Sequence, residues 1–160
     1  MVGKKAGQAA MEYLMTYGWA LLVIVIVIAI LLLMNPFSAP QTCRFDSVGF
    51  ACDNVAVTTT GALLGGITNG NNNGIIVKGI VCTTDKSSTV PGQPNGFTNT
   101  NVARQGTYSF PTGTSAISCG TGGAKGADFS GKIWVFYSND EDDTNYPVRT
   151  ASANLVTKLI

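Results

Sequence analysis

A single carboxylate stands at the edge of a long apolar run in this chain of 160 residues. Glu12 is the first acidic residue, and residues 13–34 carry no charge. A helix over that run, at about 1.5 Å per residue, is about 33 Å long, which matches the roughly 30 Å hydrocarbon core of a bilayer. A carboxylate at the centre of that core costs roughly 2.5–3.5 kcal/mol. Glu12 therefore needs either a position at the headgroup level or a partner of opposite charge.

All cysteines of the chain lie after the apolar run: Cys43, Cys52, Cys82 and Cys119. An even number confined to one side of a membrane segment predicts two disulfides in an oxidising compartment. Several pairings are possible. We favour Cys43 with Cys52, because they are close enough to staple a hairpin-like loop, and Cys82 with Cys119. No C-x-x-C spacing occurs, which disfavours zinc.

Two further segments contain residues that bind ligands in other proteins. Residues 139–143 (Asn-Asp-Glu-Asp-Asp) offer clustered carboxylates for calcium. They lack EF-hand spacing, so a solvated acidic turn is the favoured interpretation, with calcium left open. Residues 120–126 (Gly-Thr-Gly-Gly-Ala-Lys-Gly) are only superficially like a phosphate loop, because no Ser or Thr follows the lysine. We predict a surface loop there.

Several classes of function are disfavoured by composition. The chain has no histidine, so it lacks the usual general base and the commonest metal ligand, and it has no recognisable nucleophile motif. Its net charge of +1 provides no electrostatic footprint for nucleic acid. We expect neither an enzyme nor a nucleic-acid-binding protein, and no cofactor or metal.

Residues 9–34 predict one helix. Val and Ile dominate residues 23–30 and would favour a strand in water, but in lipid only a helix satisfies every backbone polar group internally. Asn35-Pro36 ends it, because proline disfavours helix in the preceding residue. Lys4 and Lys5 precede the run and keep the N-terminus in the cytoplasm, so the rest of the chain is expected outside.

The remainder of the chain predicts short strands separated by glycine and asparagine. The turn at residues 69–74 is strong, and residues 85–101 are rich in Ser, Pro, Gly and Asn and predict a long surface loop. The expected fold class is α+β: a hydrophobic N-terminal helix, then a β-sandwich or small antiparallel sheet. The strands are expected at residues 47–51, 55–60, 75–81, 107–110, 132–138, 148–153 and 155–160.

Residues 4–12 (KKAGQAAME) resemble the class III signal peptide of archaeal type IV pilins. In that family, basic residues and a small residue precede Q-x-S-x-E-x-x-x-L, which opens the apolar helix. The chain keeps the glutamine and the glutamate, Gln8 and Glu12, at the family's spacing. Ala10 stands at the usual serine and Thr16 at the usual leucine. The resemblance covers about the first fifth of the chain.

The resemblance implies processing followed by assembly. A membrane aspartic peptidase for prepilins would cut between Gly7 and Gln8, releasing a leader of residues 1–7. An assembly ATPase and a polytopic platform protein would then transfer subunits from the membrane into a homo-oligomeric filament. Residues 8–36 would be a membrane span first and filament core afterwards, and residues 37–160 an extracellular β-rich domain.

Glu12 would find its partner in such a filament. Cleavage creates an α-amino group at Gln8, and in a bundle of parallel, staggered helices the carboxylate of one subunit can pair with that amine on a neighbour. Removing one member of a buried ion pair is strongly destabilising. The pair would therefore fix the axial register of the subunits.

The expected function is that of a structural pilin for surface adhesion. The precursor would lie in the cell membrane with its N-terminus inside, and the assembled protein in an extracellular filament. Two alternatives stay open. One is a single-span, membrane-anchored extracellular binding module with Glu12 at the headgroup level. The other is a minor pilin that initiates or tips the filament.

Overall fold

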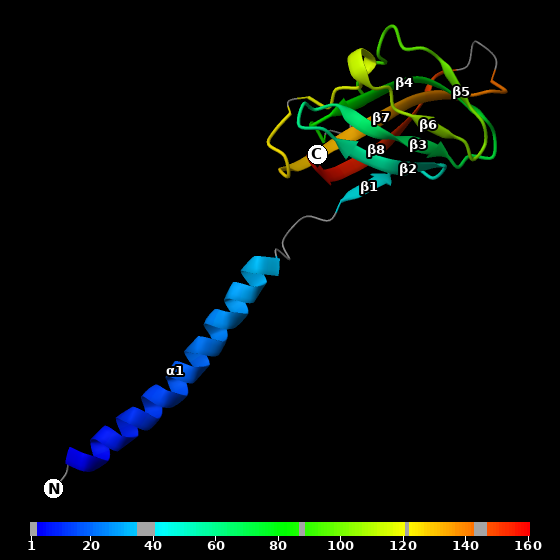
Figure 1. The fold of residues 1–160 in the computed structure, drawn as a ribbon. Helices are drawn as coiled ribbons and strands as arrows, with labels where there is room; N and C mark the ends of the chain where they lie inside the picture. Colours follow the sequence, from blue (N-terminus) through cyan, green and yellow to red (C-terminus); the bar gives the residue numbers. More distant parts are fainter. Residues whose placement is uncertain (1–2, 35–40, 87–88, 121, 143–146) are drawn as a thin grey trace. The chain divides into compact units, whose positions relative to one another are not determined.

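The chain divides into two compact units, Met1–Ser38 and Ala39–Ile160. A computed structural model describes residues 3–34, 41–86, 89–120, 122–142 and 147–160, and in the first unit it describes side chains from residue 11 onward. Figure 1 labels the elements along the chain, with one helix in the first unit and the strands in the second.

The first unit contains one long helix, α1 (Gly3–Met34, 32 residues). The predicted helix is confirmed, and it begins at Gly3, earlier than the expected residue 9. Its segment Met11–Met34, 24 residues with a mean hydropathy of 2.9, is long and apolar enough to cross a membrane. At about 1.5 Å per residue that segment is about 36 Å long.

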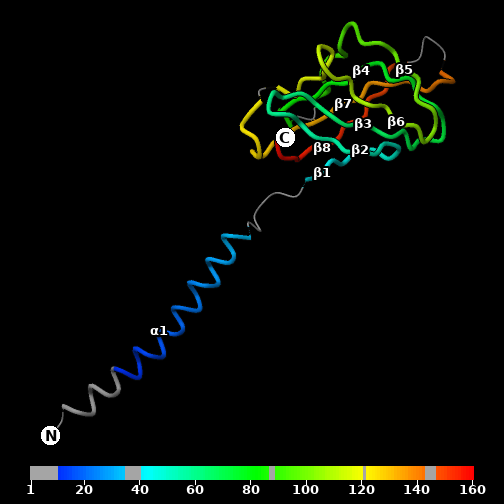
Figure 2. The backbone as a smooth tube through the Cα atoms, viewed as in Figure 1, coloured from blue at the N-terminus to red at the C-terminus, as the bar shows by residue number. Residues whose placement is uncertain are grey.

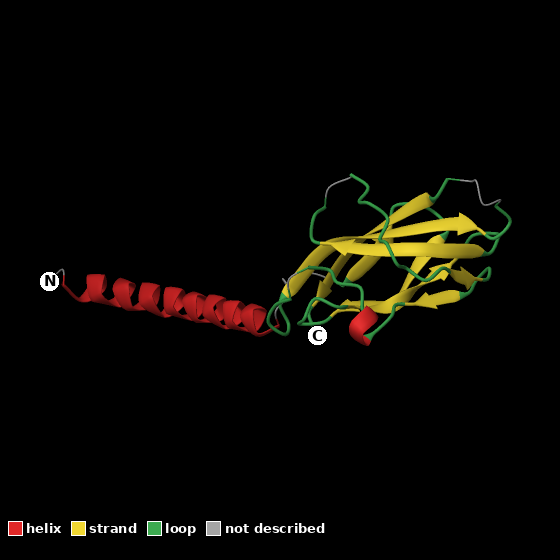
Figure 3. Cartoon of the chain, turned by 90° about the horizontal axis from the view of Figure 1, so that it is seen from above, coloured by secondary structure: helices red, strands yellow, loops and turns green. Residues whose placement is uncertain are grey.

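The second unit is an antiparallel β-sandwich, so the expected α+β fold is confirmed (Figure 3). Its larger sheet has five strands in the order β1-β8-β7-β4-β5, and its smaller sheet has three in the order β2-β3-β6. The strand bounds are β1 Thr42–Phe45, β2 Phe50–Val57, β3 Leu63–Asn69, β4 Ile75–Thr83, β5 Thr100–Val102, β6 Thr107–Ser109, β7 Asp128–Asn139 and β8 Arg149–Lys158, with a short 3-10 helix, η1, at Gly113–Ser115.

The core lies between the two sheets, and β7 is buried on both of its faces. Ile133 and Val135 are fully buried and belong to the central cluster. Trp134 and Phe136 alternate with them on the outer face, yet they are only 5% and 4% exposed. An outer sheet face is normally wet in an antiparallel sandwich, so another segment must cover it.

The connection from β4 to β5, whose backbone can be followed in Figure 2, contacts the larger sheet at several points. The Nε2 group of Gln93 donates to the carbonyl of Lys78 at 3.2 Å. A Cβ on Gly79 would come within 2.7 Å of the Pro94 ring, so glycine is required for this close approach. Pro91 and Trp134 line the same small cavity. The predicted long loop is therefore packed onto the sheet.

Several predicted strands need correction. The two strands expected at residues 47–51 and 55–60 are one strand, β2, with a bulge between Asp53 and Ala56. Gly49 lies in the turn before it with φ +103°, a value that favours glycine. The strands expected at residues 148–153 and 155–160 are likewise one strand, β8.

Three strands were not predicted: β1, β3 and β5. The sequence of β3 is interrupted by Gly65 and Gly66, which weaken any strand pattern. A side chain on Gly66 would meet the Tyr108 carbonyl on β6 at 2.5 Å, so this glycine allows close pairing. β1 and β5 have four and three residues, too few to show alternation, and β5 begins inside the predicted loop.

Both predicted disulfides are confirmed. The first joins the two sheets, and the second joins the larger sheet to the segment beside β3. Cys43 in β1 pairs with Cys52 in β2. Cys82 in β4 pairs with Cys119, whose N–H donates to the Gly61 carbonyl at 2.8 Å beside β3. The first bond connects one edge of the larger sheet, and the second connects a strand near its other edge.

The second disulfide should contribute more stability than the first. The separations of 37 and 9 residues correspond, in a chain-entropy estimate, to about 3.8 and about 2.6 kcal/mol. We expect the double variant Cys82→Ala/Cys119→Ala to unfold at a lower urea concentration than Cys43→Ala/Cys52→Ala. The buried position of Cys119 adds a cavity cost in the same direction. Equal midpoints, or the reverse order, would contradict this ranking.

Candidate functional site

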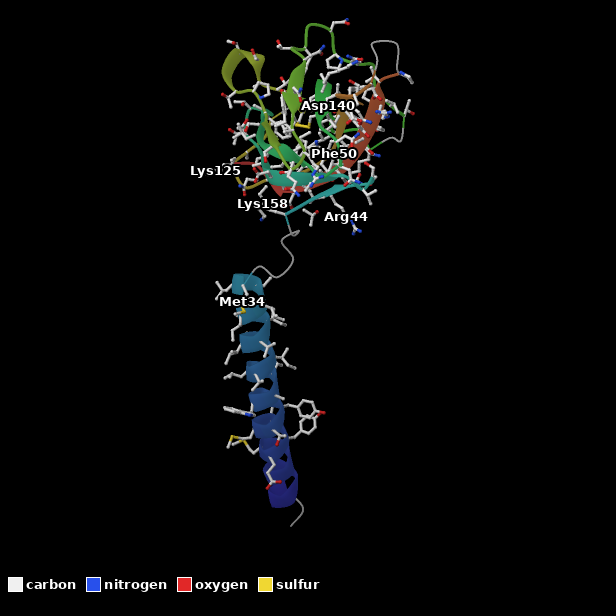
Figure 4. All side chains as sticks on the ribbon, turned by 90° about the vertical axis from the view of Figure 1, so that its right-hand side faces the viewer. Met34, Arg44, Phe50, Lys125, Asp140 and Lys158 are labelled. Atoms are coloured by element: carbon white, nitrogen blue, oxygen red, sulfur yellow. A yellow bond between two sulfur atoms is a disulfide. The ribbon has the colours of Figure 1, made fainter. Side chains whose placement is uncertain are left out.

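The apolar segment of α1 is exposed on every side. Figure 4 shows side chains projecting all around the helix. None of the segment is buried within the chain, and the exposed fractions of Met15, Trp19 and Leu33 reach 76%, 70% and 85%. A helix that is apolar all round is normally buried in a membrane or among other helices. This surface is therefore the main candidate site, and we expect a membrane or other helices to cover it.

Glu12 lies in the first turn of this segment. The Thr16 hydroxyl donates to the backbone carbonyl of Glu12 at 2.9 Å, so the hydroxyl of Thr16 is satisfied within the helix. Among the side chains that the structure describes, none forms an ion pair with the Glu12 carboxylate. Glu12 is thus the one acidic residue of a surface that is otherwise suited to an apolar environment.

Aromatic rings and a groove distinguish two faces of the helix. The rings of Tyr13 and Tyr17 lie 4.2 Å apart between centroids. On another face, Gly18 and Leu14 lie in a shallow groove together with Trp19 and three neighbours at helical spacing. A Cβ on Gly18 would meet nothing within 4 Å, so the backbone there is open to close approach.

Gly7 and Gln8, the residues of the predicted cleavage junction, lie within α1. The Gln8 side chain falls outside the described ones, and cleavage between the two residues stays a prediction. Gln8 and Glu12 are four positions apart in this helix, so they lie on the same face about 6 Å apart along the axis. One helical turn therefore separates the residues that the assembly hypothesis uses.

The acidic turn that was considered for calcium is held by the protein's own groups. Asp142 accepts a bidentate ion pair from Arg149 and a hydrogen bond of 2.9 Å from the N–H of Asn139. Glu141 accepts from the Asn73 side chain at 2.9 Å. Residue 143 lies outside the described residues. Within the described ranges, no group of three or more His, Cys, Asp or Glu side chains is arranged to hold a metal.

The glycine-rich segment, of which residues 120 and 122–126 are described and residue 121 lies outside the described ranges, precedes β7. The N–H of Gly123 donates to the Thr59 carbonyl at 2.9 Å, and that of Gly126 donates to the Leu159 carbonyl at 2.8 Å. A Cβ on Gly122 would lie 1.8 Å from the Thr59 oxygen. These glycines allow the loop to pack on the backbone beside the C-terminal strand. The amide groups that form these hydrogen bonds are therefore not free to bind a phosphate.

A cavity of about 620 Å³ lies at the edge of the sandwich where β5 and β6 end the two sheets. Sequence reasoning did not identify it. Its lining comes from β4, from the β4–β5 connection, from β6 and from the segment around η1, including Tyr108 and Ile117. These segments are far apart in the sequence, so no local motif marks the cavity.

Comparison with protein-family models, with curated proteins and with solved structures found no match to this chain.

The ion pair in the acidic turn predicts a pH dependence. The Arg149 guanidinium, helped by the Asn139 N–H, lowers the pKa of Asp142 below its ordinary value of 3.8. The unfolded chain then binds this proton more readily, so the stabilisation is present above that value and is lost as the pH falls through the lowered pKa. We expect Asp142→Asn to lower the urea midpoint at pH 7 and to lower it much less at pH 2.5.

Asp128→Asn is the matched control, because Asp128 is exposed and forms no ion pair recorded among the described residues. Its urea midpoint should follow that of the unaltered protein at both pH values. A loss in Asp142→Asn that is as large at pH 2.5 as at pH 7 would contradict an electrostatic origin.

Proposed function

We propose that this protein is a structural subunit of an archaeal type IV-like pilus that polymerises through α1 and serves in surface adhesion. The observation that carries the proposal is the combination of an all-round apolar helix with Glu12 in its first apolar turn, one helical turn after Gln8. The resemblance of residues 4–12 to the class III signal peptide supports it.

The physical argument rests on two environments for one helix. Before assembly, lipid covers the apolar side chains, and Lys4 and Lys5 hold the N-terminus on the cytoplasmic side. After cleavage between Gly7 and Gln8, neighbouring helices cover the same side chains. The Gln8 amine of one subunit then pairs with the Glu12 carboxylate of another, which offsets the desolvation of both charges.

The β unit suits the outside of such a filament. Its two disulfides are typical of an oxidising compartment outside the cytoplasm. The proposed partners are further copies of this chain, a prepilin peptidase, and an assembly ATPase with its membrane platform protein.

A second candidate function is a membrane-anchored extracellular binding module that does not polymerise. The cavity at the β5–β6 edge is the observation behind this alternative, because it has the size of a ligand site with or without polymerisation. In that case α1 would keep its leader and stay in the bilayer, with Glu12 at the headgroup level.

N-terminal sequencing of the protein from its native membrane or from sheared surface fibres separates the two functions. A pilin should begin at Gln8, whereas an anchor should begin at Met1. Gly7→Ile should block cleavage, abolish filaments and leave a membrane-bound precursor. Gly3→Ile, a matched change inside the leader, should leave processing intact. Filaments built from uncleaved precursor would overturn the proposal.

The register role of Glu12 has its own test. Glu12→Gln removes the charge with little change in shape, so we expect normal cleavage and membrane insertion but at least a tenfold loss of filaments in electron micrographs. Thr16→Val is the control, since its hydroxyl bonds only within the helix. Glu12→Gln fibres as abundant as those of the unaltered protein would exclude the ion pair.

A further inference from the structure

The cavity at the β5–β6 edge is formed where the two sheets stop facing each other. Thr100 on β5 pairs with Val77, and Tyr108 on β6 pairs with Ile67. Val77 and Ile67 are core residues, exposed by at most 1%. Residues directly opposite in an antiparallel pair share a face, so Thr100 and Tyr108 both face the space between the sheets.

The base of this cavity is formed by buried residues of the core. Ile80 and Cys82 line it from β4, and both are buried core residues. The Cys82–Cys119 disulfide ties this strand to the segment beside β3, and Ile117 and Ser118 of that segment line the opposite wall. A cavity of about 620 Å³ with such walls lies within the range of roughly 300–1,000 Å³ that is usual for pre-formed ligand sites.

The lining mixes neutral polar groups with aromatic rings. Hydroxyls come from Thr98, Thr100, Ser115, Ser118 and Tyr108, and a carboxamide comes from Asn95. The Phe97 ring, from the β4–β5 connection, lies 6.2 Å from that of Tyr108 between centroids. None of the described side chains that line the cavity is charged. The cavity therefore suits a neutral ligand that has both apolar and hydroxyl-bearing surfaces.

Tyr108 contributes both an aromatic ring and a hydroxyl group to the lining. Its ring is half-buried and also makes an edge contact with Phe110, with 6.4 Å between centroids. No hydrogen bond of its hydroxyl to another described residue is recorded, and desolvation by burial raises its pKa. A half-buried hydroxyl without a protein partner gains a hydrogen bond when a ligand hydroxyl reaches it.

We propose that this cavity is a binding site for a neutral saccharide, in which the Phe97 and Tyr108 rings contact the C–H face of a sugar and the Tyr108 hydroxyl and Asn95 carboxamide bind its hydroxyls. A neutral sugar has this combination of surfaces. An anionic ligand finds no cation in the lining, and a purely apolar one would leave the polar groups without partners.

This inference names what the proposed adhesive function would recognise, but the binding site itself does not depend on polymerisation. Many copies along one filament would strengthen its overall attachment although each site binds weakly, because after the first contact the second one occurs at high effective concentration. Weak binding by a single subunit is therefore sufficient for attachment.

The test uses the full chain in nanodiscs, because glucoside and maltoside detergents would compete. The methyl glycosides of glucose, galactose, mannose and N-acetylglucosamine, together with cellobiose and chitobiose, are titrated and followed by saturation-transfer NMR. We expect saturable binding of at least one of them. Tyr108→Phe should weaken it about two- to tenfold, the effect of one hydrogen bond. Asn95→Ala, on the exposed connection, should weaken it similarly without a change in the core.

Tyr137→Phe is the matched control, since Tyr137 loses the same hydroxyl but packs against Phe50, outside the cavity lining. It should bind as the unaltered protein does. Three results would each overturn the proposal: no saturable binding of any of these sugars, tighter binding of glucuronate than of glucose, or equal effects of Tyr108→Phe and Tyr137→Phe. None of them bears on whether the chain begins at Gln8, so this inference and the pilin proposal can fail separately.

Discussion

The main physical constraint on this protein is that the apolar surface of α1 must be covered. No part of Met11–Met34 is buried within the chain, and the segment is long enough to cross a bilayer. Lipid or other helices must therefore supply its contacts, since an all-round apolar helix has no side suited to water. Glu12 limits which surroundings can cover this segment, because a buried carboxylate needs a group of opposite charge beside it. The proposed filament meets both demands with one interface.

The β unit has an independent means of stabilisation. Its sheets enclose an apolar core. One disulfide joins the two sheets, and the other joins the larger sheet to the segment beside β3. The β4–β5 connection packs beside Trp134 on the outer face of β7. These devices suit a domain that functions outside the cell, where oxidised cysteines persist. The same cross-links keep the sheets together at the β5–β6 edge, where the core gives way to the cavity. Apolar walls with a few neutral polar groups are typical of small-molecule recognition sites.

Local signals account for what was predicted correctly. The helix followed from an uninterrupted apolar run, β4 from a β-branched segment after an Asn-Gly turn, and the disulfides from the number and spacing of cysteines. Errors arose where tertiary contacts outweighed local propensity. The bulge at Asp53–Ala56 lets β2 continue through a polar interruption. The two glycines inside β3 allow close approach of its neighbours, Gly65 to the β2 backbone and Gly66 to the β6 backbone. Neither contact is visible in a window of neighbouring residues.

The sequence by itself therefore determined the membrane-length helix, the position of Glu12 one turn from Gln8 and the α+β class, and it favoured the disulfide pairs that form. Each of these depends on residues close together or on a small set of cysteines. Only the tertiary structure decided that the strands form two sheets, that the carboxylate of Asp142 is held by Arg149, and that Thr100 and Tyr108 face one cavity. Those arrangements depend on which strands pair, and pairing is set by burial of the shared core, a property of the whole β unit.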